Sequence, residues 1–182
     1  MVRKLKFNEQ KLLKKTDFIT WSTDQAGRQN EMMAKYGVSK REHYVLYNKI
    51  AAKTRALADK LKELPLNDPY RVKKCRELIG KLYSLGLIAS ADSLERVGKI
   101  CGSSLARRRL PVVMKKSGMV NSVKVATDYV EQGHVRVGVH LVNDPAFLVT
   151  RNFQDGVTWT RGSKIREKVL DYNDARDDFD LA

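Results

Sequence analysis

The stretch "NSVKVATDYVEQGHVRVG", residues 121–138, decides the fold class because its hydrophobic period changes within a few positions. Its first half repeats small and branched apolar residues at helical spacing. In its second half, two valines alternate with His134 and Arg136, as they would in a strand with one buried face. Gly133 lies between the two patterns and can adopt the left-handed conformation that ends a helix. The stretch therefore predicts a short helix that turns directly into a strand.

Upstream, the sequence has the pattern of two successive helices. Ser39 and Glu42 fit a capping box, and Pro65 would stop the first helix. The second helix would begin at "NDPY", with Asp68 as its N-cap, and end near Gly86. The apolar residues expected to face the core are Tyr44, Tyr47, Ile50, Ala51, Leu57, Leu61 and Leu64 in the first helix and Val72, Cys75, Leu78, Ile79 and Leu82 in the second.

Downstream of these helices, the chain turns helical again over residues 93–120 and then breaks into short alternating segments. Four of these segments, "HVRVG", "HLVND", "AFLVT" and "GVTWT", predict a small antiparallel sheet. The predicted class is α+β, with a helical N-terminal half followed by a small module of two short helices packed on that sheet. The predicted parts are a basic N-terminal arm over residues 1–38, a helical region over 39–105, the module over 106–162 and a C-terminal tail over 163–182 with an acidic end.

The charge of the chain indicates a polyanionic partner. Its 35 Lys and Arg against 21 Asp and Glu give a net charge of +14 over 182 residues. Each phosphate that a cation neutralises releases a condensed counterion, so the excess favours nucleic acid or an anionic membrane. No apolar run is long enough to span a bilayer, and a membrane-surface helix would need an exposed face rich in Trp or Phe, which is weak here. Nucleic acid is therefore the favoured partner.

The N-terminal segment "KLKFNEQKLLKKTDFITW", residues 4–21, is basic and its period is too imperfect to define a helix. It is expected to be either an ordered arm that lies on a partner or a frayed terminus. The arm is favoured because Phe18 and Trp21 are costly to leave in water. Cys75 and Cys101 lack the spacing of a metal site and are interpreted as reduced intracellular thiols.

The residues that carry the predicted chemistry begin with three consecutive arginines. On a helix, Arg107, Arg108 and Arg109 would fan over nearly a full turn and offer forked donors that hold phosphates bidentately. The point charges of Lys115 and Lys116 follow one or two turns later. These five side chains predict a phosphate-binding helix.

The next helix would begin near Asn121 or Ser122, and its free N–H groups could receive a phosphate oxygen. Lys124 is unfavourable in that first turn unless an anion is bound. On the following strand, His134 and Arg136 would continue the same exposed basic ridge. Alternatively, His134 only caps the helix and Arg136 only covers apolar surface with its stem.

The two upstream helices also carry many outward cations. A charged face is usually only solvated, but RNA contact by part of this one is an equally open interpretation. The residues concerned are Lys53, Arg55, Lys60, Arg71, Lys73, Lys74 and Lys81.

At these residues a family resemblance can be identified. The segment "RRRLPVVMKKSGMVNSVKVATDYVEQGHVRVGVHLVNDPAFLVTR" resembles the RNA-binding module of the ribosomal protein S4 family, with an Arg-Leu first helix, a second helix beginning near a Ser and a Gly/His-Val-x-Val hairpin. With the lead-in "LYSLGLI", the likeness covers roughly residues 70–160. The start "MVRKLKFNEQKLLKKTDF" and the ending "DDFD" are similar to the S4-related proteins of the U3 small nucleolar ribonucleoprotein, a part of the small-subunit processome.

The resemblance implies a non-catalytic, cofactor-free assembly factor of the nucleus and nucleolus, with no membrane partner. Such a protein binds U3 small nucleolar RNA and pre-ribosomal RNA. It works with an Mpp10-type scaffold protein and other processome proteins, and it is needed for early cleavages leading to 18S rRNA. Carried onto this chain, the family's RNA face implicates Arg107, Arg108, Arg109, Lys115, Lys116, Ser122, Lys124, His134 and Arg136, with Arg151 joining from the last loop.

Two departures and two alternatives accompany this interpretation. Asp128 and Glu131 make the second helix less basic than in many relatives, which weakens the case for RNA contacts from its later turns. The acidic tail favours the processome member over the alternative, a structural small-subunit ribosomal protein of the same family. An RNA-modifying enzyme is the second alternative, but the chain has no Gly-rich phosphate loop, nucleophile pair or metal-ligand spacing.

Overall fold

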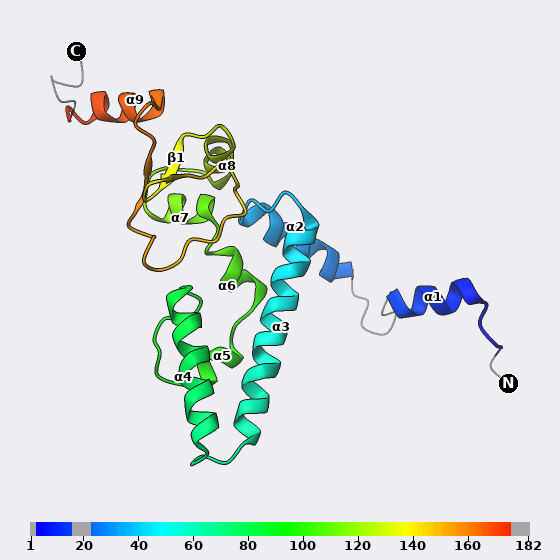
Figure 1. Ribbon diagram of the computed structural model, residues 1–182. Coiled ribbons are helices and arrows are strands. Elements are labelled where there is room, and N and C mark those ends of the chain that lie inside the picture. Colours follow the sequence, from blue (N-terminus) through cyan, green and yellow to red (C-terminus); the bar gives the residue numbers. More distant parts are fainter. Residues whose placement is uncertain (1–2, 16–22, 176–182) are drawn as a thin grey trace.

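The computed structural model describes residues 3–15 and 23–175, so Phe18, Trp21 and the acidic end at 176–182 lie outside the described residues. The helical first half and the antiparallel sheet with its helices confirm the predicted α+β class (Figure 1). The elements of the described ranges are α1 Phe7–Lys15, α2 Thr23–Lys35, α3 Arg41–Glu63, α4 Pro69–Ser84, α5 Glu95–Gly98, α6 Gly102–Ala106, α7 Leu110–Lys116, α8 Val123–Glu131, β1 Val135–Val137, β2 His140–Leu141, β3 Val157–Trp159 and α9 Lys164–Tyr172.

The two long helices, α3 and α4, run antiparallel beside each other in Figure 1. Pro65 follows the end of α3, and Asp68 caps α4 by accepting a hydrogen bond from the Tyr70 amide at 2.9 Å, both as predicted. The predicted capping box is wrong, because α3 begins after Lys40 and no side chain caps it. Gly86 ends the α4 turn with a φ of +72°.

A first hydrophobic core joins α3 and α4 to the short helices α5 and α6. Tyr47, Ala51 and Leu82 are buried in it as predicted. Ile50 and Leu57, expected inside, are 38% and 48% exposed, because Ala58 rather than Leu57 faces the neighbouring helices.

A second core lies under the C-terminal module, defined here as α7, α8 and the three strands with their connections. The α7 and α8 helices pack on the face of the sheet that carries Val135, Val137 and Val157. The strands have the order β2-β1-β3, and both pairings are antiparallel. Gly133, with a φ of +78°, turns the chain from α8 into β1, as the change of period predicts.

The fourth predicted strand, "AFLVT", is wrong as a member of the sheet. An Asp144 carboxylate accepts from the Ala146 amide, which bends the chain away at this point. The backbone that follows pairs with the connection between α6 and α7: the Leu110 amide donates to the Phe147 carbonyl, and the Val149 amide donates to the Arg108 carbonyl. The segment therefore pairs with the connection between α6 and α7 rather than with β3.

Several helices differ from the predicted pattern. The expected helical stretch over 93–120 is divided into α5, α6 and α7, while α2 and α9 arise inside the predicted arm and tail. Figure 1 shows α1 set apart from the body of the molecule. Within the described ranges, no helix combines the length and the apolar character needed to cross a membrane.

Candidate nucleic-acid interface

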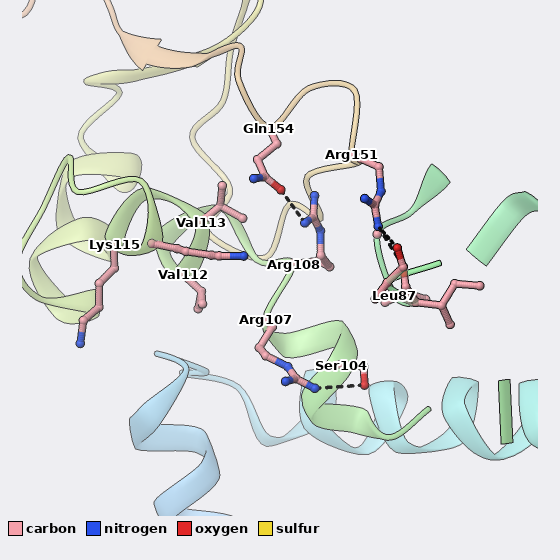
Figure 2. A pocket seen from close by; sticks show the side chains of 13 residues that line it. Leu87, Ser104, Arg107, Arg108, Val112, Val113, Lys115, Arg151 and Gln154 are labelled. Carbon is pink, nitrogen blue, oxygen red and sulfur yellow. Dashed lines mark hydrogen bonds between the residues drawn. The ribbon is translucent and has the colours of Figure 1, made fainter. Parts of the chain in front are cut away.

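A concave pocket of about 770 Å³ lies between the two cores (Figure 2). One wall comes from the loop after α4, and the other comes from α6, α7 and the loop before β3. We call it the cationic pocket. It is lined by Gly86, Leu87, Ile88, Ala89, Ser104, Arg107, Arg108, Val112, Val113, Lys115, Lys116, Arg151 and Gln154.

The charges of the pocket are all of one sign. Five of its lining side chains are cationic, and none is Asp or Glu. The ion pairs formed between described residues lie elsewhere, for example Lys62 with Asp59 and Lys74 with Glu77. Like charges that converge without a counter-charge create a local field that attracts an anion.

Arg108 is the innermost cation of this group. Its Nε donates to the Val149 carbonyl at 2.9 Å and its Nη1 to the Gln154 side chain at 2.8 Å, while Nη2 is buried without an acceptor among the described atoms. Burial lowers the pKa of Arg108, and the neighbouring charge of Arg151 lowers it further. Gly86 makes room for this guanidinium, since a Cβ there would lie 2.8 Å from Arg108 Cζ.

Arg151 stands beside Arg108 in Figure 2 and is equally well held. Its Nη2 donates to the Ile88 carbonyl at 2.9 Å and its Nε to the Tyr83 carbonyl at 3.2 Å. Its guanidinium lies 4.1 Å from the centroid of the Tyr83 ring. Arg151, the last predicted contact residue, is therefore fixed in the lining of the pocket by the end of α4 and the loop that follows it.

The remaining pocket cations are exposed and lie nearer solvent. Arg107 is the C-cap of α6, and its Nη2 donates to the Ser104 hydroxyl at 3.4 Å on the side of the pocket opposite Gln154 (Figure 2). Lys115 and Lys116 come from the last turn of α7. In Figure 2 the Lys115 side chain points away from Arg108.

Arg109 is a correction to the predicted RNA face. It is 1% exposed, and its guanidinium donates to the Tyr47 hydroxyl at 2.9 Å and to the Gly37 carbonyl at 3.4 Å. The physical reason is that the three arginines do not share one helix. Since α6 ends at Ala106 and α7 begins at Leu110, Arg109 lies in extended backbone that bridges to Leu148, and its side chain turns inward. It joins the two cores and cannot reach a surface ligand.

The other predicted contacts do not line the cationic pocket. Ser122 and Lys124 are exposed at the start of α8, where Ser122 is the N-cap without a side-chain hydrogen bond. Both remain predictions as RNA contacts.

On β1, Arg136 points to the face opposite the buried valines, hence away from α7 and α8, and its Nε donates to the Thr158 hydroxyl at 2.9 Å. His134 Nδ1 lies 3.0 Å from the Ser163 hydroxyl, and its ring meets the Tyr129 ring edge-on. The alternative that His134 caps the helix is supported, because its backbone amide also donates to the Tyr129 carbonyl of α8 at 3.0 Å. One continuous ridge from Arg107 to Arg136 is not what the structure forms.

Sequence reasoning missed the uncharged part of the pocket. Gln154 carries no charge, and 46 positions separate it from Arg108 in the chain. Two residues of the wall, Leu87 and Ile88, end the motif "LYSLGLI", whose apolar character is the sequence signal for them. No group of His, Cys, Asp and Glu among the described residues could hold a metal ion.

Comparisons with known proteins match the chain in two segments. A family model described as the ribosomal protein S4/S9 N-terminal domain matches residues 4–106, and one described as the S4 domain matches residues 108–153. The chain is 59% identical over 181 residues to the U3 small nucleolar ribonucleoprotein protein imp3 of Caenorhabditis elegans, covering 100% of this chain and 99% of the relative. It is 49% identical over 182 residues to the Homo sapiens protein of that name, with coverages of 100% and 99%. The small ribosomal subunit protein uS4 of Picrophilus torridus is 26% identical over 149 residues, which is 81% of each chain.

Proposed function

Because the chain belongs to the S4-domain family of U3 small nucleolar ribonucleoprotein IMP3 proteins, we propose that it is a non-catalytic RNA-binding factor of ribosome assembly. It binds U3 small nucleolar RNA and pre-ribosomal RNA within the small-subunit processome of the nucleolus. There it supports the early cleavages that lead to 18S rRNA, together with an Mpp10-type scaffold protein.

The observation that carries this proposal is the cationic pocket. Five cationic side chains from two parts of the chain line one pocket, and no carboxylate lines it. Arginine forks bind phosphate oxygens bidentately, and lysines add point charges at the rim. An RNA backbone meets both requirements of this site, since it is anionic and presents phosphates at regular intervals.

The proposed role is mechanical rather than chemical. Two RNA segments that must pair repel each other through their phosphates. A protein that neutralises part of that charge lowers the repulsion and holds the segments in register. Specificity comes from junction shape and unpaired nucleotides, because the deep groove of an RNA helix cannot be read by side chains.

The test compares two triple variants of the full chain that remove the same charge. Arg107→Ala with Lys115→Ala and Lys116→Ala removes three pocket cations. Lys53→Ala with Arg55→Ala and Lys60→Ala removes three exposed cations of α3 outside the pocket. Affinity for U3 and pre-ribosomal RNA fragments is measured by fluorescence anisotropy across a salt series.

We expect the pocket variant to lower the log–log salt slope by roughly 0.7 to 0.9 for each phosphate that the variant no longer neutralises, and the α3 variant to leave the slope nearly unchanged. Equal effects of the two variants would contradict a localised RNA site. Crosslinking in cells, mapped to nucleotides, should place the binding site in U3 and pre-ribosomal RNA.

A structural small-subunit ribosomal protein of the same family is the alternative. The lower identity of 26% to an archaeal uS4 protein, against 59% and 49% to the imp3 relatives, weakens it. Sedimentation separates the two roles, because a structural protein would accompany mature small subunits, whereas an assembly factor leaves before they are complete.

A further inference from the structure

We propose that the cationic pocket holds a single nucleotide extruded from an RNA helix, with its base against the apolar wall and its phosphate between the cations. This inference rests on the proposed function, because it names the unit of RNA that the same site takes. It adds a prediction that general phosphate binding does not make, namely a preference for RNA with an unpaired, bulged nucleotide.

The lining has two chemical halves. Beside its cations, the pocket is walled by Leu87, Ile88, Ala89, Val112 and Val113. Phosphates of an intact duplex gain nothing from apolar side chains. A base that leaves its stack does, since burying its faces removes apolar surface from water. The wall and the cations together therefore fit a complete nucleotide better than a backbone alone.

Arg108 and Gln154 bring polar groups to the pocket. Arg108 Nη2 is buried without an acceptor among the described atoms, and a buried donor left unpaired costs free energy. The Gln154 amide accepts from Arg108 through its oxygen, which leaves its nitrogen as a donor. The acceptor atoms of a base edge, or a phosphate oxygen, would accept from the Gln154 nitrogen, while Arg108, whose Nη2 is buried, contributes its positive charge to the site.

The site is also held in place before any ligand enters. Arg108 is fixed by the Val149 carbonyl and Gln154, and Arg151 by the Ile88 carbonyl and the Tyr83 ring. Side chains ordered in advance lose little conformational freedom on binding. A rigid hollow of this kind favours a compact inserted group over a sliding, non-specific contact.

The position of Lys115 indicates that the nucleotide belongs to a longer RNA. Its side chain lines the pocket but is exposed and points away from Arg108 in Figure 2, so it lies at the edge of the site. It is placed to meet the phosphates that flank an extrusion. A free mononucleotide has no such flanking phosphates.

The experiment uses the full chain and two RNA hairpins that differ only in one bulged nucleotide. The bulged position carries 2-aminopurine, whose fluorescence reports loss of base stacking. We expect the bulged hairpin to bind roughly tenfold more tightly than the paired one, and its fluorescence to change on binding. Free uridine and adenosine monophosphate are tested as competitors and are expected to compete weakly.

Two variants fill the pocket without changing its charge. Ala89→Trp and Val112→Trp place a large ring against the apolar wall, and Val125→Trp on the outer side of α8 is the matched control. Both pocket variants should abolish the preference for the bulge while keeping affinity for the paired hairpin. The control should retain the preference. Because Ala89 is exposed, its variant remains informative even if Val112→Trp fails to fold.

The outcomes are distinguishable from failure of the proposed function. Equal binding of the bulged and paired hairpins would overturn the nucleotide pocket and leave RNA binding intact. Binding of neither hairpin would overturn both proposals. Free monophosphates that bind as tightly as the bulged hairpin would overturn the assignment to RNA. If both Trp variants still prefer the bulged hairpin, the bulged nucleotide binds elsewhere on the protein.

Discussion

At the scale of single residues, three identical neighbours in the sequence have three different environments. Arg107 is exposed, Arg108 is half-buried against carbonyl and amide oxygens, and Arg109 is enclosed between Tyr47 and Gly37. The break between α6 and α7 produces this difference, because it replaces a helical fan by a turn and an extended residue. Arg107 and Arg108 are therefore placed to bind a ligand, whereas Arg109 stabilises the fold.

Substitution by Ala should separate these two roles. Arg109→Ala removes a buried side chain and leaves the Tyr47 hydroxyl without its donor, so we expect a loss of about 2–4 kcal/mol in unfolding free energy. Arg107→Ala should change stability by no more than about 0.5 kcal/mol while weakening RNA binding. Urea denaturation and RNA titration measure the two effects. A stable Arg109→Ala protein with reduced RNA affinity would contradict the inward role of that residue.

At the scale of elements, the end of α4 shapes the pocket as much as the arginines do. Gly86 has a φ of +72°, which side chains disfavour, and it lies directly against the Arg108 guanidinium. The same end of α4 supplies the Tyr83 ring and carbonyl that hold Arg151. One helix terminus therefore sets the positions of two cations, Arg108 just before α7 and Arg151 in the loop before β3.

Gly86→Ala should therefore affect both stability and binding. We expect it to cost about 1–2 kcal/mol through backbone strain, and to displace Arg108 and so weaken RNA affinity. Gly80→Ala is the matched control, since it lies inside α4 with no atom within 4 Å of a new Cβ. That control should gain about 0.5–1 kcal/mol and bind RNA normally. Thermal unfolding measures the stability of both variants, and fluorescence anisotropy measures their RNA affinity. Equal stability and equal affinity of the two variants would argue against the Gly86 contact.

The helices, turns and strands also show which features of the fold can be predicted from the sequence. Local chemistry predicted the Asp68 cap, the Pro65 stop and the Gly133 turn, because each depends on a few adjacent residues. It failed for "AFLVT", whose backbone partners at Arg108 and Leu110 are distant in sequence. It found the pocket cations but neither their depth nor Gln154, because both follow from how the two cores meet.

At the scale of the whole molecule, the helices beyond the two cores differ in how they attach. The loop after α2 is tied to the body, because Arg109 donates to the Gly37 carbonyl and Val38 is buried. By contrast, α1 lies apart in Figure 1 with Phe7 76% exposed. Glu9 stabilises the start of α1 through Arg3 and the Lys6 amide, but a helix this short is marginal in water without packing partners.

Deletion of residues 1–15 should accordingly leave the unfolding free energy and the affinity for short RNA unchanged. The same deletion should weaken co-purification with processome particles, because it removes a segment that contributes to neither core. Quantitative mass spectrometry of affinity-purified particles measures that decrease, and the RNA titration serves as the control. Equal decreases in the two measurements would refute an arm that binds protein.

The cationic pocket straddles the border between the two matched segments, residues 4–106 and 108–153. The lining residues after α4 belong to the first segment. Most of the cations belong to the second. A chimera that borrows only the second segment would inherit Arg108 without the glycine beneath it and Arg151 without its aromatic support. Exchanging one of these segments between proteins would therefore transfer only part of the pocket. A change in the RNA specificity of the pocket must be introduced in both segments together.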